Sequence, residues 1–350
     1  MNRIGSSHLV LVALALGLAA CSSPAFDLVG PPTAAGSSES GVESSSEDDT
    51  SGAPTGGDDP GAETGGDDDG SGGTTGASKP PYEPGEFAGC PDPLPDGWVL
   101  CEDFERIDNL ATTFFEYQDG EGAFVLSEGG AASGTHAMTA TYREGLEGAG
   151  YLSAAFGRNP IVYGELPQAS TDTDFQSIYW RLRVKMHEGW PDVGPGHLTS
   201  ATAFASDAWD QAMIARLRSD ADNVVLWAEP ISCVVGDSVA CNGFEDTDGQ
   251  RALGGLVGAT PLFSSKQSGK WHCVEAHVAL NTPGASDGAF EFWVDGELQN
   301  AAYQLDWRGT WAEYGINLVT VQNLWPGGAP AELERSIDDL VISTAPIGCD

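Results

Sequence analysis

The sequence predicts an all-β domain, built as a sandwich of two antiparallel sheets. Two runs, 271–280 and 289–295, alternate apolar with polar side chains, and the segment between them is rich in Asn, Pro, Gly and Asp. This pattern is typical of a β-hairpin. Gly and Pro separate short apolar runs throughout 88–350, where no helical periodicity extends over three turns. All-β sandwiches of this length are often single domains.

The first strand of this hairpin would present two chemically different faces, because successive side chains of a strand point to opposite sides of the sheet. One face would hold His272, Val274, Ala276, Val278 and Leu280, and the other Trp271, Cys273, Glu275 and His277. We expect the first face to pack and the second to meet water or a ligand.

Five segments together resemble a known fold. Residues 269–296 combine a Trp, a Glu four residues on, an LN-x-PG-x-x-DG turn and a WVDG strand end. The other segments are 101–105 (CEDFE), 134–143 (GTHAMTATYR), 175–190 (FQSIYWRLRVKMHEGW) and 336–344 (SIDDLVIST). They resemble the concanavalin A-like jelly roll of polysaccharide lyase families 14 and 20, and the lyase-like core of a fungal cellulose-induced secreted protein. Laminin-G-like domains share a weaker form of the pattern.

The N-terminus predicts export. Arg3 precedes an apolar run, 9–18, which is too short to span a bilayer and ends in the sequence LAAC at Cys21. This ending resembles the lipobox of bacterial lipoproteins, which implies a signal peptide over 1–20 and lipidation of Cys21. Ser22 resembles the residue found in lipoproteins released to the outer membrane, so we expect anchoring there or at the cell surface. A plain signal peptide with a chance cysteine is the alternative.

Residues 21–87 predict a lipidated cysteine followed by a disordered linker. Beyond Cys21 they consist largely of Gly, Ser, Thr, Pro, Asp and Glu, with almost no large apolar side chain to bury. Such a chain remains solvated and repels itself. Its acidic blocks lack the alternating ligands of calcium loops. The domain predicted to follow spans 88–350.

Six cysteines accompany that domain: Cys90, Cys101, Cys233, Cys241, Cys273 and Cys349. An even number after a signal peptide predicts a disulfide framework in an oxidising compartment. Cys233 and Cys241 lie close together in one loop and form the easiest pair. The other four cysteines allow three pairings, which the sequence does not separate.

The net charge of −37 argues against nucleic acid and anionic lipid as partners. The few basic residues are nevertheless grouped, because Arg181, Arg183 and Lys185 alternate along one expected strand and Arg216 and Arg218 along another. We expect their side chains to form one basic stripe on a single concave sheet face. The alternative is a solvated face whose charges pair with neighbouring Asp and Glu.

A basic stripe predicts a site for uronate sugars. In β-elimination, a base removes the proton beside the sugar carboxylate while a cation stabilises the developing enolate. Catalytic candidates are Tyr179, Arg181, Arg183, Lys185 and His277; substrate-binding candidates are Arg216, Arg218 and His197, the last equally a loop residue at the mouth of a cleft. The lysine-glycine-rich segment and the tyrosine pair of the alginate-lyase branch are missing. Hydrolysis is disfavoured, because no E-x-D-x-E strand occurs.

Trp190, Trp293 and Trp325 are further substrate-binding candidates, because partly exposed indole faces suit the CH groups of sugars. Trp98 and Trp180 are expected in the core.

No cofactor is required for this chemistry. The resemblance to the jelly-roll families does imply a structural calcium ion between the first and last strands, held by Glu102 or Asp103 and by Asp338 or Asp339. Solvated turns are the alternative.

The sequence as a whole predicts an exported lipoprotein whose jelly-roll domain engages polysaccharide. Three functions stay open: a lyase acting on uronate glycans, a noncatalytic glycan-binding or adhesion module, and an envelope scaffold without affinity for sugars. The membrane would be contacted through the lipid anchor only.

Replacing Cys21 by alanine tests the predicted anchor. Cys21→Ala removes the only thiol in the signal region, so the variant should acquire no lipid and should appear in the soluble periplasmic fraction or the medium. Fractionation and intact mass measure both outcomes. Continued fractionation of the variant with membranes, as for the parent chain, would contradict the prediction.

Overall fold

The computed structural model describes residues 89–349, apart from 108, 162–166, 220–223 and 244–247. The predicted signal peptide, Cys21 and linker lie outside the described residues. Strands dominate the described part, where the α-helix is a single turn, α1 (Leu110–Thr113). No helix in these ranges is long and apolar enough to cross a membrane.

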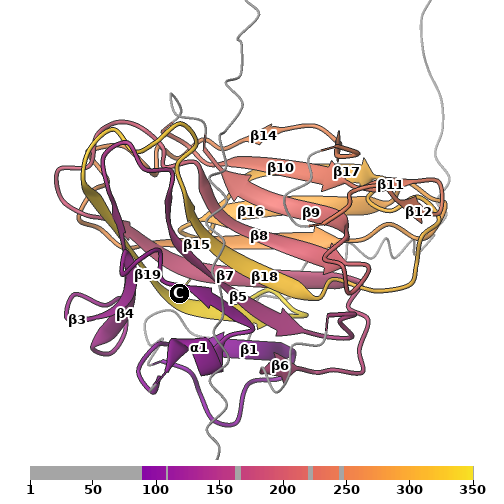
Figure 1. The fold of residues 1–350 in the computed structure, drawn as a ribbon, viewed down its shortest axis with the longest axis horizontal. Helices are drawn as coiled ribbons and strands as arrows, with labels where there is room; N and C mark the ends of the chain where they lie inside the picture. The colour runs from indigo at the N-terminus through magenta and orange to yellow at the C-terminus, as the bar shows by residue number, and fades with distance from the viewer. Residues whose placement is uncertain (1–88, 108, 162–166, 220–223, 244–247, 350) are drawn as a thin grey trace, which may run out of the picture. The chain divides into compact units, whose positions relative to one another are not determined.

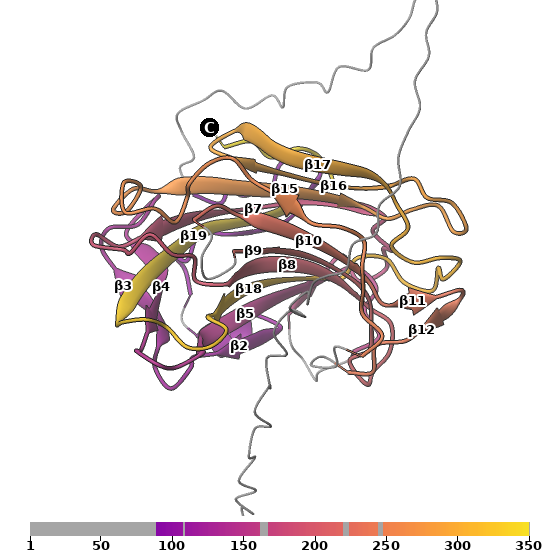
Figure 2. The same cartoon turned by 90° about the horizontal axis from the view of Figure 1, so that it is seen from above.

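Two sheets form a sandwich (Figures 1 and 2). Sheet A has the order β17 (Glu297–Leu305), β16 (Gly288–Val294), β15 (His272–Ala279), β7 (Ser177–Met186), β19 (Leu333–Ser343), β4 (His136–Tyr142) and β3 (Phe124–Glu128), with β1 (Trp98–Glu102) on β19. Sheet B has the order β13 (Arg251–Ala252), β10 (Trp227–Ser232), β9 (Gln211–Arg218), β8 (His197–Phe204), β18 (Leu318–Leu324), β5 (Gly148–Phe156) and β2 (Glu116–Gln118), with β14 (Leu256–Val257) on β10 and β6 (Gln168–Ala169) on β5. A separate hairpin joins β11 (Val234–Val235) to β12 (Ser238–Val239).

The predicted jelly-roll sandwich is confirmed. The hairpin expected at 271–295 is the β15–β16 pair, joined in antiparallel register from Val274 opposite Val294 to Ala279 opposite Ala289. The long strand expected within 175–190 is β7, at the centre of sheet A between β15 and β19. Strand β19 covers most of the expected last strand and lies beside β1 and β4.

The core lies between the sheets and follows the alternation of each strand. Along β7, Trp180, Leu182 and Val184 are buried in a cluster that also contains Ala215 and Leu217 of β9. The indole N–H of Trp180 also donates to Oγ1 of Thr199, on β8 of the opposite sheet. Side chains between these positions therefore point away from the core, on what we call the outer face of each sheet.

Three disulfides join the six cysteines of the domain. Cys233–Cys241 is the predicted pair. The others are Cys90–Cys101 and Cys273–Cys349, which tie the entry to β1 and the C-terminal segment to sheet A.

Two of the tryptophans predicted as sugar platforms are core residues. Trp190 and Trp325 are 1% and 3% exposed, and their rings lie 5.8 Å apart with Tyr142 packed edge-on against both. Their Gly/Pro-containing surroundings suggested exposed loops. The expectation is wrong because both indoles pack with Tyr142 in the main hydrophobic core.

Arg335 links the two sheets through the interior. It extends from β19 of sheet A, is fully buried, and donates to the carbonyl oxygens of His197 and Gln322 and to Oδ1 of Asn323. The strand register of sheet B is irregular at these positions, between His197 and Thr199 and between Val321 and Leu324. The guanidinium therefore supplies donors where the ladder is interrupted.

Removing this guanidinium should destabilise the domain. Arg335→Ala leaves three buried acceptors without that donor, and each such loss costs about 1–3 kcal/mol, so the free energy of unfolding should fall by roughly 3 kcal/mol or more in denaturant titrations. Arg251→Ala is the matched control, because the Arg251 side chain is 49% exposed and surface changes usually stay within about 0.5 kcal/mol. Equal effects of the two substitutions would show that the inter-sheet link contributes nothing.

Candidate functional site

The five cations predicted to share one stripe lie on opposite outer faces of the sandwich. Arg181, Arg183 and Lys185 belong to β7 in sheet A, whereas Arg216 and Arg218 belong to β9 in sheet B. In both strands the residues between them enter the common core. The expectation of a single sheet face is therefore wrong: the alternation was correct, but the two strands join different sheets.

The three cations of sheet A have partners in the C-terminal segment, on strand β19 and in a loop. Arg181 is 1% exposed and donates to the carbonyl of Gly348. Nε of Arg183 lies 3.3 Å from the fully buried carboxylate of Asp339. Lys185 donates to the carbonyl of Gly130 and lies 4.7 Å from the ring centroid of Trp271.

A disulfide holds the C-terminal segment over this part of sheet A. The Cys273–Cys349 bond fixes its end, and both oxygens of the Glu275 carboxylate accept hydrogen bonds, from the N–H groups of Ile347 and Gly348. Burial raises the pKa of Glu275, while these two N–H groups act in the opposite direction. These contacts cover Arg181, so that guanidinium is not available to a glycan.

The two predicted bases also lie on the outer face of sheet A. Tyr179 and His277 stand opposite each other on β7 and β15, with rings stacked 4.1 Å apart. Trp293 lies beside them at 6.4 Å from the Tyr179 ring. Tyr179, His277 and the β7 cations are thus neighbours, as predicted, but Arg216 and Arg218 are on the other side of the core.

Two of the predicted cations lie on the outer face of sheet B. The guanidinium groups of Arg216 and Arg218 both bind the carboxylate of Glu229 on β10, at 2.9 and 3.2 Å. Their side chains are 18% and 22% exposed. Among the described residues, the two guanidinium groups thus share one carboxylate on a sheet face that is partly exposed.

His197 lies beside these two arginines. The sequence predicted it either as a substrate-binding residue or as a loop residue at the mouth of a cleft. It lies in register opposite Arg218 on β8 and β9. Burial lowers the pKa of His197 to about 3, with help from the charges of Arg216, Arg218 and Arg335. The imidazole is therefore neutral at physiological pH and adds hydrogen-bonding capacity without charge.

The surrounding residues were not predicted from the sequence. A polar row crosses sheet B from Glu229 and Arg216 through Ser200, Thr320 and Ser153 to Glu116, by strand register. Trp227 flanks the row, with its ring centroid 5.4 Å from the Arg218 guanidinium carbon. A possible signal was the W-x-E spacing of Trp227 and Glu229, which matches the R-x-R spacing of the neighbouring strand.

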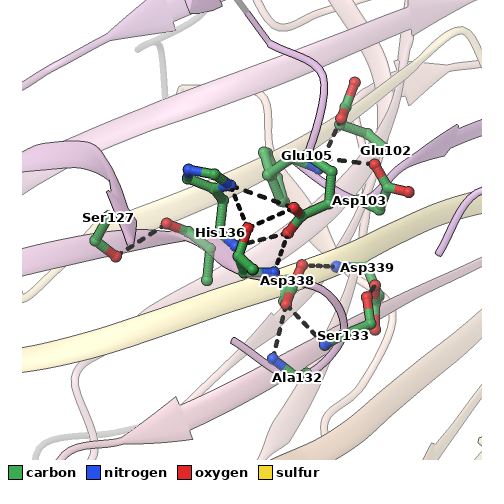
Figure 3. A network of polar contacts seen from close by, with 12 residues as sticks. Glu102, Asp103, Glu105, Ser127, Ala132, Ser133, His136, Asp338 and Asp339 are labelled. Atoms are coloured by element: carbon green, nitrogen blue, oxygen red, sulfur yellow. Dashed lines mark hydrogen bonds and ion pairs between the residues drawn. The ribbon is translucent and has the colours of Figure 1, made fainter. Parts of the chain in front are cut away.

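The four carboxylates predicted to bind calcium gather where β1 meets β19 (Figure 3). Asp103, Asp338 and Asp339 are buried. Burial and the neighbouring charge of Asp339 raise the pKa of Asp338 to about 7. The approach of these groups was therefore predicted correctly.

These carboxylates are engaged by the chain itself. Glu102 accepts from the N–H of Phe104, Asp103 from those of Cys90 and Glu105, Asp338 from those of Ala132 and Ser133, and Asp339 from the Ser133 hydroxyl. In the part of the chain that the structure describes, no group of three or more His, Cys, Asp or Glu side chains is placed to hold a metal ion. Calcium stays a prediction of the resemblance.

Comparison with known proteins gives similarity at the level of solved structures only. No family model matches the chain, and no curated protein matches it. The endo-β-1,4-glucuronan lyase of the fungus Trichoderma reesei is 14% identical, with a TM-score of 0.45 over 70% of this chain and 95% of its own. The marine PL-14 alginate lyase of Aplysia kurodai is 15% identical, with a TM-score of 0.48 over 71% and 99%. The cellulose-induced protein Cip1 is 15% identical, with a TM-score of 0.41 over 72% and 100%.

These similarities are too low to carry an argument about function. The fold rests on the strand pairing of this chain, and the function must be argued from its own side chains.

The depressed pKa of His197 gives a direct test of the sheet B site. Since the folded pKa of about 3 lies below the unfolded value near 6.5, its Hε1 NMR signal should stay constant from pH 8 to 5. The linked stability is complete above pH 6.5 and declines as the pH falls toward 3, because the unfolded chain binds the proton first. His197→Gln should remove this component. A midpoint between pH 6 and 7 in the folded protein would refute the assignment; the urea-unfolded chain is the control.

Proposed function

We propose that the domain binds an acidic, uronate-containing polysaccharide along the outer face of sheet B. The observation that carries the proposal is the cluster of Arg216, Arg218 and Glu229, in which two guanidinium groups share one carboxylate beside a neutral histidine. A guanidinium offers five N–H donors in a planar fork. Arg216 uses Nη1 to bond Glu229, which leaves other N–H groups of its fork for the carboxylate of a bound sugar.

The surroundings suit a sugar chain. Hydrogen bonding to a sugar would come from the guanidinium groups, because the hydroxyls of Ser153 and Thr320 farther along the polar row are buried and bond each other at 3.0 Å. Trp227 presents an aromatic ring at the edge of the cluster, where the CH groups of a pyranose can pack. Charge, hydrogen bonding and an apolar surface thus occur together on one sheet face.

The geometry favours binding over β-elimination. The predicted bases Tyr179 and His277 lie on the opposite sheet and cannot reach a sugar held by Arg216 or Arg218. His197 is close to those arginines, but an imidazole with a pKa of about 3 accepts a proton poorly at neutral pH. The proposed role is therefore that of a glycan-binding or adhesion module.

We also propose that the domain acts outside the cytoplasm, held by lipid on Cys21. Three disulfides among the described residues support export, because such bonds persist in oxidising compartments. A solvated linker would then let the domain reach extracellular glycans.

Charge variants of the cluster test the glycan proposal. Arg218→Gln should weaken retention on a uronate polysaccharide by about 10- to 100-fold, the equivalent of a lost charge-assisted bond of roughly 1.5–3 kcal/mol. Glu229→Gln should strengthen it, because both arginines lose a competing carboxylate. Both effects should shrink as salt rises, and a neutral glucan should show neither.

Affinity electrophoresis and calorimetry on the purified chain measure these changes. Arg251→Gln is the matched control, since this exposed arginine lies on β13 and bonds Asp306 instead. Release of unsaturated product would replace the binding role by a lyase. Absence of retention on every glycan would leave the scaffold function.

A further inference from the structure

The outer face of sheet A holds a hydrogen-bonded chain of Ser177, His277 and Glu291. Oγ of Ser177 lies 2.9 Å from Nε2 of His277, and Nδ1 of the same imidazole lies 2.8 Å from Oε2 of Glu291. Both contacts have hydrogen-bond geometry. The three side chains come from three adjacent strands, β7, β15 and β16.

Strand register builds this chain. His277 stands opposite Glu291 on β16 and opposite Tyr179 on β7, and Ser177 follows two positions from Tyr179 on the same face. The Tyr179 ring stacks on the imidazole at 4.1 Å, and the Tyr303 hydroxyl donates to the other oxygen of Glu291 at 2.5 Å. The imidazole is therefore fixed from three sides.

The hydrogen bonds also fix the tautomer. An ionised carboxylate only accepts, and hydrogen bonding from His277 is the first cause that lowers the pKa of Glu291. The proton of a neutral imidazole then lies on Nδ1, facing Glu291. Nε2 is left as the acceptor of the Ser177 hydroxyl proton, as a general base requires.

We propose that Ser177 is the nucleophile of an ester-hydrolysing site on the outer face of sheet A, with His277 as general base and Glu291 as the residue that positions it. This activity is independent of the glycan binding assigned to sheet B. The substrate class is a carboxylic ester, because a serine activated in this way attacks acyl carbonyl carbon.

The proposed reaction is ester hydrolysis, with water as the second reactant. Oγ of Ser177 bonds to the ester carbonyl carbon while its proton passes to Nε2 of His277. The carbon–oxygen bond to the alcohol then breaks, and the alcohol leaves with that proton. Water, deprotonated by the same nitrogen, attacks the acyl-serine, and the carboxylic acid and the free Ser177 hydroxyl are released. No oxidant or reductant is involved.

Two aromatic residues supply the remaining parts of the proposed site: a hydrogen-bond donor for the carbonyl oxygen and an apolar surface for the substrate. Tyr179 lies on the same face two residues along β7, and burial raises its pKa, so the phenol stays protonated; in the proposed reaction it would donate to the negative carbonyl oxygen of the intermediate. Trp293, with its ring 6.4 Å from that of Tyr179, offers an apolar surface for the alcohol part of the ester.

A second serine–histidine–glutamate chain on sheet A provides an internal control for this geometry. His187 lies 2.9 Å from Glu334 through Nδ1 and 2.9 Å from Oγ of Ser336 through Nε2. Ser336 is 4% exposed and bonds Thr139 as well. This second chain reproduces the hydrogen bonds with a buried hydroxyl, whereas Ser177 is only partly buried. A reagent that requires an accessible, activated serine should therefore discriminate between them.

The test uses the full chain with a fluorophosphonate probe and with p-nitrophenyl acetate. The probe's phosphorus should bond to Oγ of Ser177 with loss of fluoride, located by peptide mass mapping. Ser177→Ala should abolish labelling and ester turnover, His277→Gln should slow both by about 100-fold or more, and Ser336→Ala should change neither. Glu291→Gln should slow turnover and alter its pH profile, with partial recovery in Glu291→Asp.

Thermal melting of each variant separates loss of fold from loss of chemistry. Labelling of Ser177 together with turnover that disappears in a folded Ser177→Ala protein supports the proposal. It is overturned if Ser177 is not labelled, if Ser336 is labelled equally, or if turnover survives in Ser177→Ala.

Discussion

Each sheet of this domain buries one face against the other, and every functional assignment depends on that shared core. Trp180, Leu182 and Val184 of sheet A pack in one cluster with Ala215 and Leu217 of sheet B. At about 25 cal/mol per Å² of apolar surface, such burial is the main favourable term in folding. Because it fixes the inward residues of each strand, it also fixes which residues face solvent.

Polar side chains also span this core and join the two sheets. The indole of Trp180 donates to Thr199, and the guanidinium of Arg335 donates to His197, Gln322 and Asn323. The second contact lies directly behind the sheet B cluster, since it engages the backbone of the histidine opposite Arg218. Interior packing and the proposed glycan site therefore share a residue, and the buried charge helps to keep that histidine neutral.

The outer faces of the two sheets carry different polar side chains, although strands of both sheets alternate in the same way. On sheet A, the disulfide-fixed C-terminal segment covers Arg181 and Glu275, which leaves the Ser177–His277–Glu291 chain and its aromatic neighbours beside it. On sheet B, Arg216 and Arg218 share the carboxylate of Glu229. The proposed anion site thus lies on one face and the proposed serine nucleophile on the other.

The sequence by itself determined the fold class, the β15–β16 hairpin, the central strand β7 and the Cys233–Cys241 bond, because alternation and short loop closure are local properties of the chain. It also determined which side chains of β7 and β9 avoid the core. Only the tertiary structure decided which outer face each strand contributes to: a sandwich has two such faces, and alternation is the same for both. The Gly348 partner of Arg181, the burial of Trp190, and the Cys273–Cys349 bond across 76 residues likewise depend on segments distant in sequence, which meet only in the folded domain.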